Sequence, residues 1–450
     1  MILVRHGEST FNAQRKVQGH NDESSLTEAG LQGASQVGSA LQDLSFAAVY
    51  SSPFKRARET TNGILSQMTA AKGSTPPTPQ FTDNLREISL PLWEGLTFDE
   101  VESKFPELYR CWRDRPHELC MPLVTEAGTE EFYPVVALYE QAKRFWQETL
   151  PCHAEETILV VAHSGINRCL ISAAMNLGVT GYKALYQSNC GISVVNFSGV
   201  LGDPAQLESM NQTGHLGEPL PKIRKNQKGP RLLLVRHGET EWNRQKRFQG
   251  QIDVPLNDNG RTQSQQAGAF LQSTRIDRAV TSPMLRPKET AEIILQHHPH
   301  IPLELEDNLQ EISHGLWEGK LEAEIEQEFP GELQRWQQTP AEVQMPEGEN
   351  LNQVWERAIA AWEKIVASTS ANPADSAITV LVVAHDAVNK AILCHLAGQG
   401  PEAFWSFKQG NGAVSVIDYP DGATGRPVIQ AMNLTHHQGG VLDKTAAGAL

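Results

Sequence analysis

The six residues LVRHGE occur twice in the chain, at positions 3–8 and again at 234–239. The residues that follow also repeat, as ESTFNAQRKVQG at 8–19 and ETEWNRQKRFQG at 239–250. Self-similarity at so long a spacing indicates that one whole domain has been duplicated. The chain is therefore expected to fold as two similar halves.

The duplication continues through each half. LREISLPLWEG (85–95) matches LQEISHGLWEG (309–319), and TILVVAHSGINR (157–168) matches TVLVVAHDAVNK (379–390). Between the halves, residues 217–231 are rich in proline, glycine and lysine, which is typical of a linker. We therefore predict one domain at 1–220 and a second at 230–450.

Within each half, short apolar runs alternate with longer amphipathic segments. Strands are expected at 47–52 and 278–282, and helices at 26–44 and 256–274, where Thr27 and Asn257 are suitable N-caps. Alternating strands and helices predict an α/β fold, in which each domain has a mostly parallel sheet with helices on both faces.

Two apolar strands in each half end in a histidine. In doubly wound sheets, ligands bind outside the carboxyl ends of the strands. His6 and His163 are therefore expected to meet at one edge of the first sheet, and His237 and His385 at one edge of the second.

The residue types at these edges suit phosphoryl chemistry. A neutral imidazole, with a pKa of about 6.5, is a good nucleophile toward phosphorus, and arginine binds phosphate bidentately. Gly7 and Gly238 would let the backbone approach the phosphate. Glu87 and Glu311 could protonate a leaving alcohol if burial raises their pKa, although a surface salt bridge is the alternative.

These motifs, in this order, resemble the histidine phosphatase superfamily, also called phosphoglycerate mutase-like, in both halves. The resemblance implies tandem phosphoglycerate mutase-like domains with His6 and His237 as phosphorylated nucleophiles and Glu87 and Glu311 as proton donors. It also implies phosphate pockets lined by Arg5, Arg56 and His163 and by Arg236, Arg286 and His385. Substrate or phosphate contacts would come from Asn12, Gln18, Asn243 and Gln249. No metal ion or cofactor is implied.

The superfamily contains both phosphatases and mutases. From the acid to the second histidine there are 163 − 87 = 76 residues in the first half and 385 − 311 = 74 in the second, which is short for a mutase with a long lid. A metal-independent phosphomonoesterase acting on a small phosphorylated metabolite is therefore favoured. A phosphoglycerate mutase, a phosphoserine phosphatase and a sensor that binds without turnover remain alternatives.

The tandem arrangement, with YPV (133–135) and LESMNQT (207–213), is similar to plant 2-carboxy-D-arabinitol-1-phosphatases. This narrower resemblance implies a sugar or sugar-acid phosphate as the substrate. Dimers are common in the superfamily, so we also expect the two halves to form an intramolecular pseudo-dimer.

Composition restricts the remaining classes of function. The net charge of −15 disfavours nucleic acid and acidic membranes as partners, and no 18-residue apolar run is present. Six cysteines without a CxxC pattern, and a first strand that follows Met1 directly, favour a cytoplasmic protein.

The two halves also differ beside the expected pockets. Ser164 follows the second histidine of the first half, whereas Asp386 follows that of the second. An aspartate there could repel phosphate if its side chain points inward, or it could point away. Cys190 occupies the position of Gly412, and a buried thiol is expected there, with redox sensitivity as the alternative.

Overall fold

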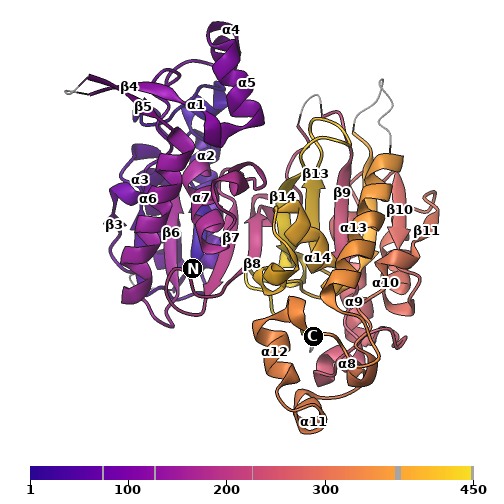
Figure 1. The fold of residues 1–450 in the computed structure, drawn as a ribbon. Helices are drawn as coiled ribbons and strands as arrows, with labels where there is room; N and C mark the ends of the chain where they lie inside the picture. Colours follow the sequence, from indigo (N-terminus) through magenta and orange to yellow (C-terminus); the bar gives the residue numbers. More distant parts are fainter. Residues whose placement is uncertain (73–75, 126–127, 225–226, 370–376, 447–450) are drawn as a thin grey trace. The chain divides into compact units, whose positions relative to one another are not determined.

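A computed structural model describes residues 1–72, 76–125, 128–224, 227–369 and 377–446. The chain divides into two compact units, Met1–Glu218 and Pro219–Leu450, which run from indigo to magenta and from magenta to yellow in Figure 1. Residues 225–226 of the expected linker lie outside the described residues. None of the helices in the described part of the chain has the length and apolar character that crossing a membrane requires.

The first unit contains a sheet with the order β3-β2-β6-β1-β7-β8. The first four of these strands run parallel to one another, and β7 runs antiparallel to both of its neighbours, β1 and β8. The strands are β1 (Ile2–Arg5), β2 (Ala48–Ser51), β3 (Gln80–Phe81), β6 (Ile158–Ala162), β7 (Ile192–Phe197) and β8 (Ala205–Gln212). The helices are α1 (Thr10–Ala13), α2 (Glu28–Leu41), α3 (Lys55–Lys72), α4 (Phe98–Lys104), α5 (Pro106–Asp114), α6 (Pro134–Thr149) and α7 (Ser164–Ala174).

The second unit repeats this topology with the order β11-β10-β12-β9-β13-β14. Its strands are β9 (Arg231–Arg236), β10 (Arg278–Thr281), β11 (Leu303–Leu305), β12 (Thr379–Ala384), β13 (Val414–Asp418) and β14 (Val428–Leu434). Its helices are α8 (Glu241–Gln245), α9 (Asp258–Leu271), α10 (Leu285–Leu295), α11 (Glu322–Glu328), α12 (Glu332–Gln338), α13 (Leu351–Ser368) and α14 (Asp386–Leu396). The predicted α/β fold is thus present in both halves.

The apolar runs become strands because helices cover them on both faces. Leu233 and Val235 of β9 pack with residues of α9 and α10 in one core. Their neighbours Leu232 and Leu234 point to the opposite face and are equally buried. Continuous apolar sequence is expected in a strand that is buried on both sides.

The helices α2 and α9 begin directly after the N-cap residues predicted for them, Thr27 and Asn257. The side chain of Thr27 accepts a hydrogen bond from Gly30 N, and that of Asn257 accepts one from Gly260 N. These caps fix the start of α2 and α9, because they satisfy a backbone N–H that has no partner within the helix.

A second contact joins the same helix to the Arg-His-Gly turn. A Cβ added to Gly30 would lie 2.1 Å from the carbonyl oxygen of Glu8, and one added to Gly7 would lie 2.4 Å from that of Gly30. Gly260 and Gly238 make the equivalent close approach in the second unit. The glycines therefore allow two backbone segments to touch, while the approach of a phosphate to them stays a prediction.

The units differ most after the acidic motif. In the first unit Met121–Thr125 (β4) and Gly128–Phe132 (β5) form an antiparallel hairpin. In the second unit, Gly315 has φ +54° and packs against the carbonyl oxygen of Pro346. Pro91 stands at the position of Gly315, and proline cannot adopt a positive φ. The first unit therefore cannot adopt this loop conformation.

Replacing Gly30 with alanine tests the contact between the helix and the turn. We expect Gly30→Ala to lower the free energy of unfolding by about 1–3 kcal/mol, because the added carbon overlaps backbone that cannot move aside. Urea denaturation measures this loss. Gln32→Ala, at an exposed position of the same helix, is the control, and equal stability of the two variants would contradict the contact.

Candidate active site in each unit

His6 and His237 directly follow β1 and β9, so each imidazole lies at the carboxyl end of an interior strand. Each ring places Nδ1 2.7 Å from the carbonyl oxygen of the next residue, Gly7 or Gly238. A carbonyl oxygen only accepts, so Nδ1 carries the hydrogen and Nε2 of the neutral ring keeps its lone pair. The geometry therefore leaves Nε2 as the nitrogen that could attack an electrophile.

The structure brings the second histidine of each half beside the first. The ring centroids of His6 and His163 are 5.1 Å apart, and those of His237 and His385 are 5.2 Å apart. His163 follows β6 and His385 follows β12, which are the parallel neighbours of β1 and β9. Adjacent strands of one sheet thus deliver both rings.

A fully buried arginine contacts one of the two rings in each unit. Arg56 donates from Nη1 to Asn21 O (3.1 Å) and from Nη2 to Gly19 O (3.0 Å), which anchors its guanidinium. Its Nε donates to His163 Nδ1 at 3.2 Å. Since that nitrogen accepts, Nε2 of the neutral His163 carries the hydrogen and donates to Ser52 Oγ at 2.7 Å.

Arg286 has the same anchors in the second unit but a different ring partner. It donates to Ile252 O at 3.3 Å and to Gly250 O at 2.8 Å, while its Nε donates to His237 Nε2 at 3.2 Å. The nitrogen that accepts this bond is the one identified above as carrying the lone pair.

All four histidines are held in the neutral form. Burial lowers the pKa of His6 and His237 well below the usual value, and the positive charge of Arg56 or Arg286 lowers it further. The same two causes, in the same order, lower the pKa of His163 and His385. Each expected nucleophile is therefore unprotonated at neutral pH.

Glu87 lies against the first turn of α7. Its carboxylate accepts hydrogen bonds from the backbone N–H groups of Gly165 (3.0 Å), Ile166 (3.2 Å) and Ile88 (2.8 Å). The absence of a side chain at Gly165 allows this contact, since an added Cβ would lie 2.3 Å from Glu87 Oε1. The carboxyl group is therefore fixed beside the strand ends.

Glu311 occupies the equivalent place with looser contacts. It accepts from Asp386 N at 3.1 Å and from Ala387 N at 3.5 Å, where the first unit has glycine. Burial raises the pKa of Glu311, and repulsion from Asp386 raises it further. Glu311 is thus buried, and the surface salt bridge considered for it is excluded.

The four predicted amide residues also support the loops. Asn12 and Asn243 accept backbone hydrogen bonds that cap α1 and α8. Gln18 Oε1 accepts from Ser9 Oγ at 3.0 Å, and Gln249 Oε1 accepts from Thr240 Oγ1 at 2.7 Å. The Nε2 of Gln249 is buried without a hydrogen-bond partner among the described residues, so a donor remains for a ligand.

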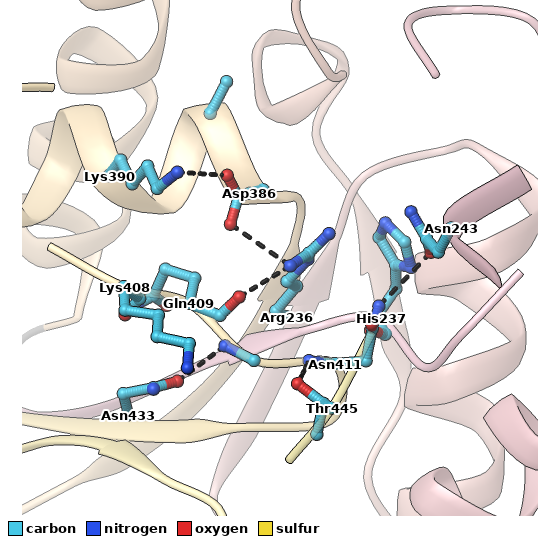
Figure 2. A network of polar contacts seen from close by, with 12 residues as sticks. Arg236, His237, Asn243, Asp386, Lys390, Lys408, Gln409, Asn411, Asn433 and Thr445 are labelled. Carbon is cyan, nitrogen blue, oxygen red and sulfur yellow. Dashed lines mark hydrogen bonds and ion pairs between the residues drawn. The ribbon is translucent and has the colours of Figure 1, made fainter. Parts of the chain in front are cut away.

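Arg236 belongs to a polar network that Figure 2 shows. Its Nη1 donates to Gln409 O at 2.6 Å and lies 3.2 Å from Asp386 Oδ1, and Asp386 Oδ2 lies 2.7 Å from Lys390 Nζ. In the first unit Arg5 donates to Gln187 O at 2.8 Å. The side chain of Asp386 therefore points inward, toward Arg236 of the predicted phosphate pocket, and its carboxylate also contacts Lys390.

Three further residue pairs hold the histidines of the site in position and were not singled out from sequence. Thr60 and Thr290 accept from the backbone N–H of Gly7 (2.9 Å) and Gly238 (3.1 Å). Asn189 and Asn411 donate to the carbonyl oxygens of His6 (2.9 Å) and His237 (3.3 Å). The remaining pair is Ser52 and Ser282, whose Oγ atoms bind the second histidines. All six lie in segments that repeat between the halves, and this repetition is the sequence feature that could have pointed to them.

Cys190 is a buried thiol, as expected. Burial raises its pKa to about 12, so the reactive thiolate is scarce at neutral pH. Its φ of +56° matches the φ of +69° at Gly412, the residue it replaces. Both residues therefore lie in the same turn, whose positive φ favours glycine. The buried thiol, with its raised pKa, gives no support for redox sensitivity.

The sequence profile of the histidine phosphatase superfamily (branch 1) matches residues 1–212 and 232–435. These matches cover most of the chain, which therefore belongs to that superfamily. The predicted family, the two phosphoglycerate mutase-like domains and the class of phosphoric monoester hydrolase are confirmed.

Three curated relatives illustrate the match. The chain is 28% identical over 445 residues to 2-carboxy-D-arabinitol-1-phosphatase of Triticum aestivum, covering 98% of this chain and 86% of that protein. An Arabidopsis thaliana relative assigned the same activity is 28% identical over 456 residues, covering 98% and 88% of the two chains. Phosphoserine phosphatase 1 of Hydrogenobacter thermophilus is 34% identical over 209 residues, covering 46% of this chain and 94% of that protein.

The second unit also contains a buried histidine that has no counterpart in the first. The ring of His314 contacts Phe248 and Trp336, with centroids 5.2 Å and 6.0 Å away. Neither ring nitrogen has a hydrogen-bond partner in the described part of the chain, and burial lowers the pKa of His314 to about 3. Leu90, at the equivalent position of the first unit, is also buried.

This histidine should make the second unit sensitive to acid. Its pKa rises from about 3 when folded to about 6.5 when unfolded, so protonation favours unfolding as pH falls from about 6.5 toward 3. The cost approaches about 1.4 kcal/mol per pH unit. We expect His314→Leu to reduce the pH dependence of stability by up to that amount.

Urea unfolding at pH 7, 6, 5 and 4, followed by tryptophan fluorescence, measures the effect. The site histidines act in the same direction in both proteins, so the difference between wild type and variant isolates His314. If wild type and His314→Leu lost the same stability as the pH is lowered, His314 would not be the source of the acid sensitivity.

Proposed function

We propose that each half is a phosphomonoesterase centre that forms a phosphohistidine on His6 or His237 and requires no metal ion. The observation that carries this proposal is the bond from Nδ1 to the carbonyl oxygen of the next glycine, at 2.7 Å in both units. It leaves Nε2 unprotonated beside buried arginines. The substrate is a small phosphorylated metabolite, and a sugar-acid phosphate such as 2-carboxy-D-arabinitol 1-phosphate is supported by the two relatives that match nearly the whole chain.

In the first step, Nε2 of His6 attacks phosphorus and the bond from phosphorus to the ester oxygen breaks. The carboxyl group of Glu87 supplies the proton that the departing alkoxide takes up. Arg5, Arg56 and His163 surround the transferring PO3 group and stabilise its charge.

In the second step, water replaces the alcohol. Glu87, now ionised, accepts a proton from the water as it attacks phosphorus, and the phosphorus–nitrogen bond breaks. Inorganic phosphate leaves and the neutral imidazole is restored. His237, Arg236, Arg286, His385 and Glu311 have the corresponding roles in the second unit, and Asn12, Gln18, Asn243 and Gln249 contact the bound group.

Trapping the intermediate tests the nucleophiles. Brief exposure to a substrate labelled in its phosphate, followed by alkaline quenching that preserves phosphohistidine, should label both His6 and His237. His6→Ala should retain label only on His237, His237→Ala only on His6, and the double variant should lose hydrolysis by several orders of magnitude. Label on neither residue in an active preparation would exclude the mechanism, and an isomerised ester in place of free phosphate would indicate a mutase.

The proton donors can be tested by changing the leaving group. In the His237→Ala protein, Glu87→Gln should lower kcat/KM, which reports only the steps up to formation of the phosphohistidine, about 10²–10⁴-fold with an alkyl phosphate, since the alkoxide then departs unprotonated. The loss should be much smaller with 4-nitrophenyl phosphate, whose leaving group needs no proton.

Glu94→Gln is the matched control for this experiment. Glu94 Oε1 accepts from His20 N (2.9 Å) and Leu90 N (3.1 Å), and a glutamine oxygen can keep both bonds. Its activity with both substrates should stay close to that of the parent protein. Equal losses with both substrates in Glu87→Gln would refute the assigned role.

A further inference from the structure

The two candidate sites differ in total charge over a set of three equivalent positions, because one of the three is charged only in the second unit. Arg5 and Arg236 are the last residues of β1 and β9. Arg168 and Lys390 lie on α7 and α14, and the third position is the first residue of each of these helices. That third residue is Ser164 in the first unit and Asp386 in the second. The first unit therefore has two cations where the second has two cations and one anion.

In the second unit the carboxylate of Asp386 binds both cations (Figure 2). One oxygen lies 3.2 Å from Arg236 Nη1, the other lies 2.7 Å from Lys390 Nζ, and all three side chains are almost fully buried. Lys390 is further fixed above the rings of Phe404 and Trp405, at 4.9 Å and 4.7 Å from their centroids. Here the protein itself supplies a carboxylate beside the phosphoryl pocket.

In the first unit no carboxylate takes that place. Arg168 stacks on Tyr182 and Tyr186, with its guanidinium carbon 5.4 Å and 5.8 Å from the ring centroids. Neither Arg5 nor Arg168 forms an ion pair with an acidic side chain of the described residues, and the Nε of each is buried without a hydrogen-bond partner. Ser164, half-buried and uncharged, replaces the anion.

The positive charge of Arg168 acts on Arg5. Burial is the main reason that the pKa of Arg5 lies below its usual value; Tyr186 and Glu87 raise this pKa, and repulsion from Arg168 lowers it. Like charges held together away from water are costly unless an anion binds between them. The first site therefore has a binding place for a second anionic group, in addition to the phosphoryl pocket.

We propose that Arg5, Ser164 and Arg168 form a carboxylate subsite, and that Asp386 fills the equivalent place in the second unit. The first site then prefers phosphate esters that also carry a carboxylate, while the second prefers esters that do not. This inference rests on the proposed phosphatase activity and extends it by assigning a different substrate class to each half.

Two substrates with the same three-carbon skeleton test the subsite. 3-Phosphoglycerate carries a carboxylate where glycerol 3-phosphate carries a hydroxymethyl group. Using the full chain, the His237→Ala protein reports the first site and the His6→Ala protein the second. We expect the ratio of kcat/KM for 3-phosphoglycerate to that for glycerol 3-phosphate to be about tenfold or more higher at the first site.

Exchanging the third residue should exchange the preference. Ser164→Asp in the His237→Ala protein should lower the ratio toward the value of the second site, and Asp386→Ser in the His6→Ala protein should raise it. Ser164→Asn, similar in size to aspartate but uncharged, should keep the high ratio. Arg168→Gln should lower it, with partial recovery in Arg168→Lys.

The ratio is measured on one protein at a time, so a loss of folded enzyme affects both substrates equally and leaves the ratio unchanged. Equal ratios for the two single-site proteins would overturn the subsite, as would a Ser164→Asn effect equal to that of Ser164→Asp. Absence of phosphate release from every ester by every variant would instead overturn the proposed function.

Discussion

The chemistry assigned to each half depends on a single hydrogen bond, from Nδ1 of the strand-end histidine to the carbonyl oxygen of the next glycine. That bond selects the tautomer, and the tautomer decides which nitrogen can attack. The carbonyl can point at the ring because the turn itself is held from several sides. The N–H of Gly7 donates to Thr60, Asn189 donates to the carbonyl oxygens of His6 and Gly7, and Gly30 brings a helix against the same backbone. The orientation of one imidazole is therefore a property of a whole layer of the fold.

Much of this arrangement was predictable because it depends on local sequence. The apolar run before His6 and the one before His163 specify buried parallel strands, and strands of that kind deliver their last residues to a common edge. The caps Thr27 and Asn257 are likewise readable, since an N-cap acts on the backbone three residues away. Duplication strengthened each of these assignments, because a residue needed by the site had to appear twice.

Other features depend on contacts that no local pattern specifies. Asn189 binds the nucleophile turn only because the loop before β7 closes over it, and the sequence separation is more than 180 residues. The sequence did not fix the direction of the Asp386 side chain. In the structure, its ion pair with Lys390 one helical turn later helps to set that direction. The burial of His314 among aromatic rings follows from tertiary packing alone.

The residues assigned to each site come from one half of the chain, so this polypeptide contains two separate sets of candidate catalytic groups. Whatever amount of the protein is synthesised, both centres are present in a one-to-one proportion. Two independent genes would need matched expression to keep that balance, whereas a fused chain keeps it automatically. The two copies can also differ in charge, as they do at Ser164 and Asp386, while the proportion between them stays constant.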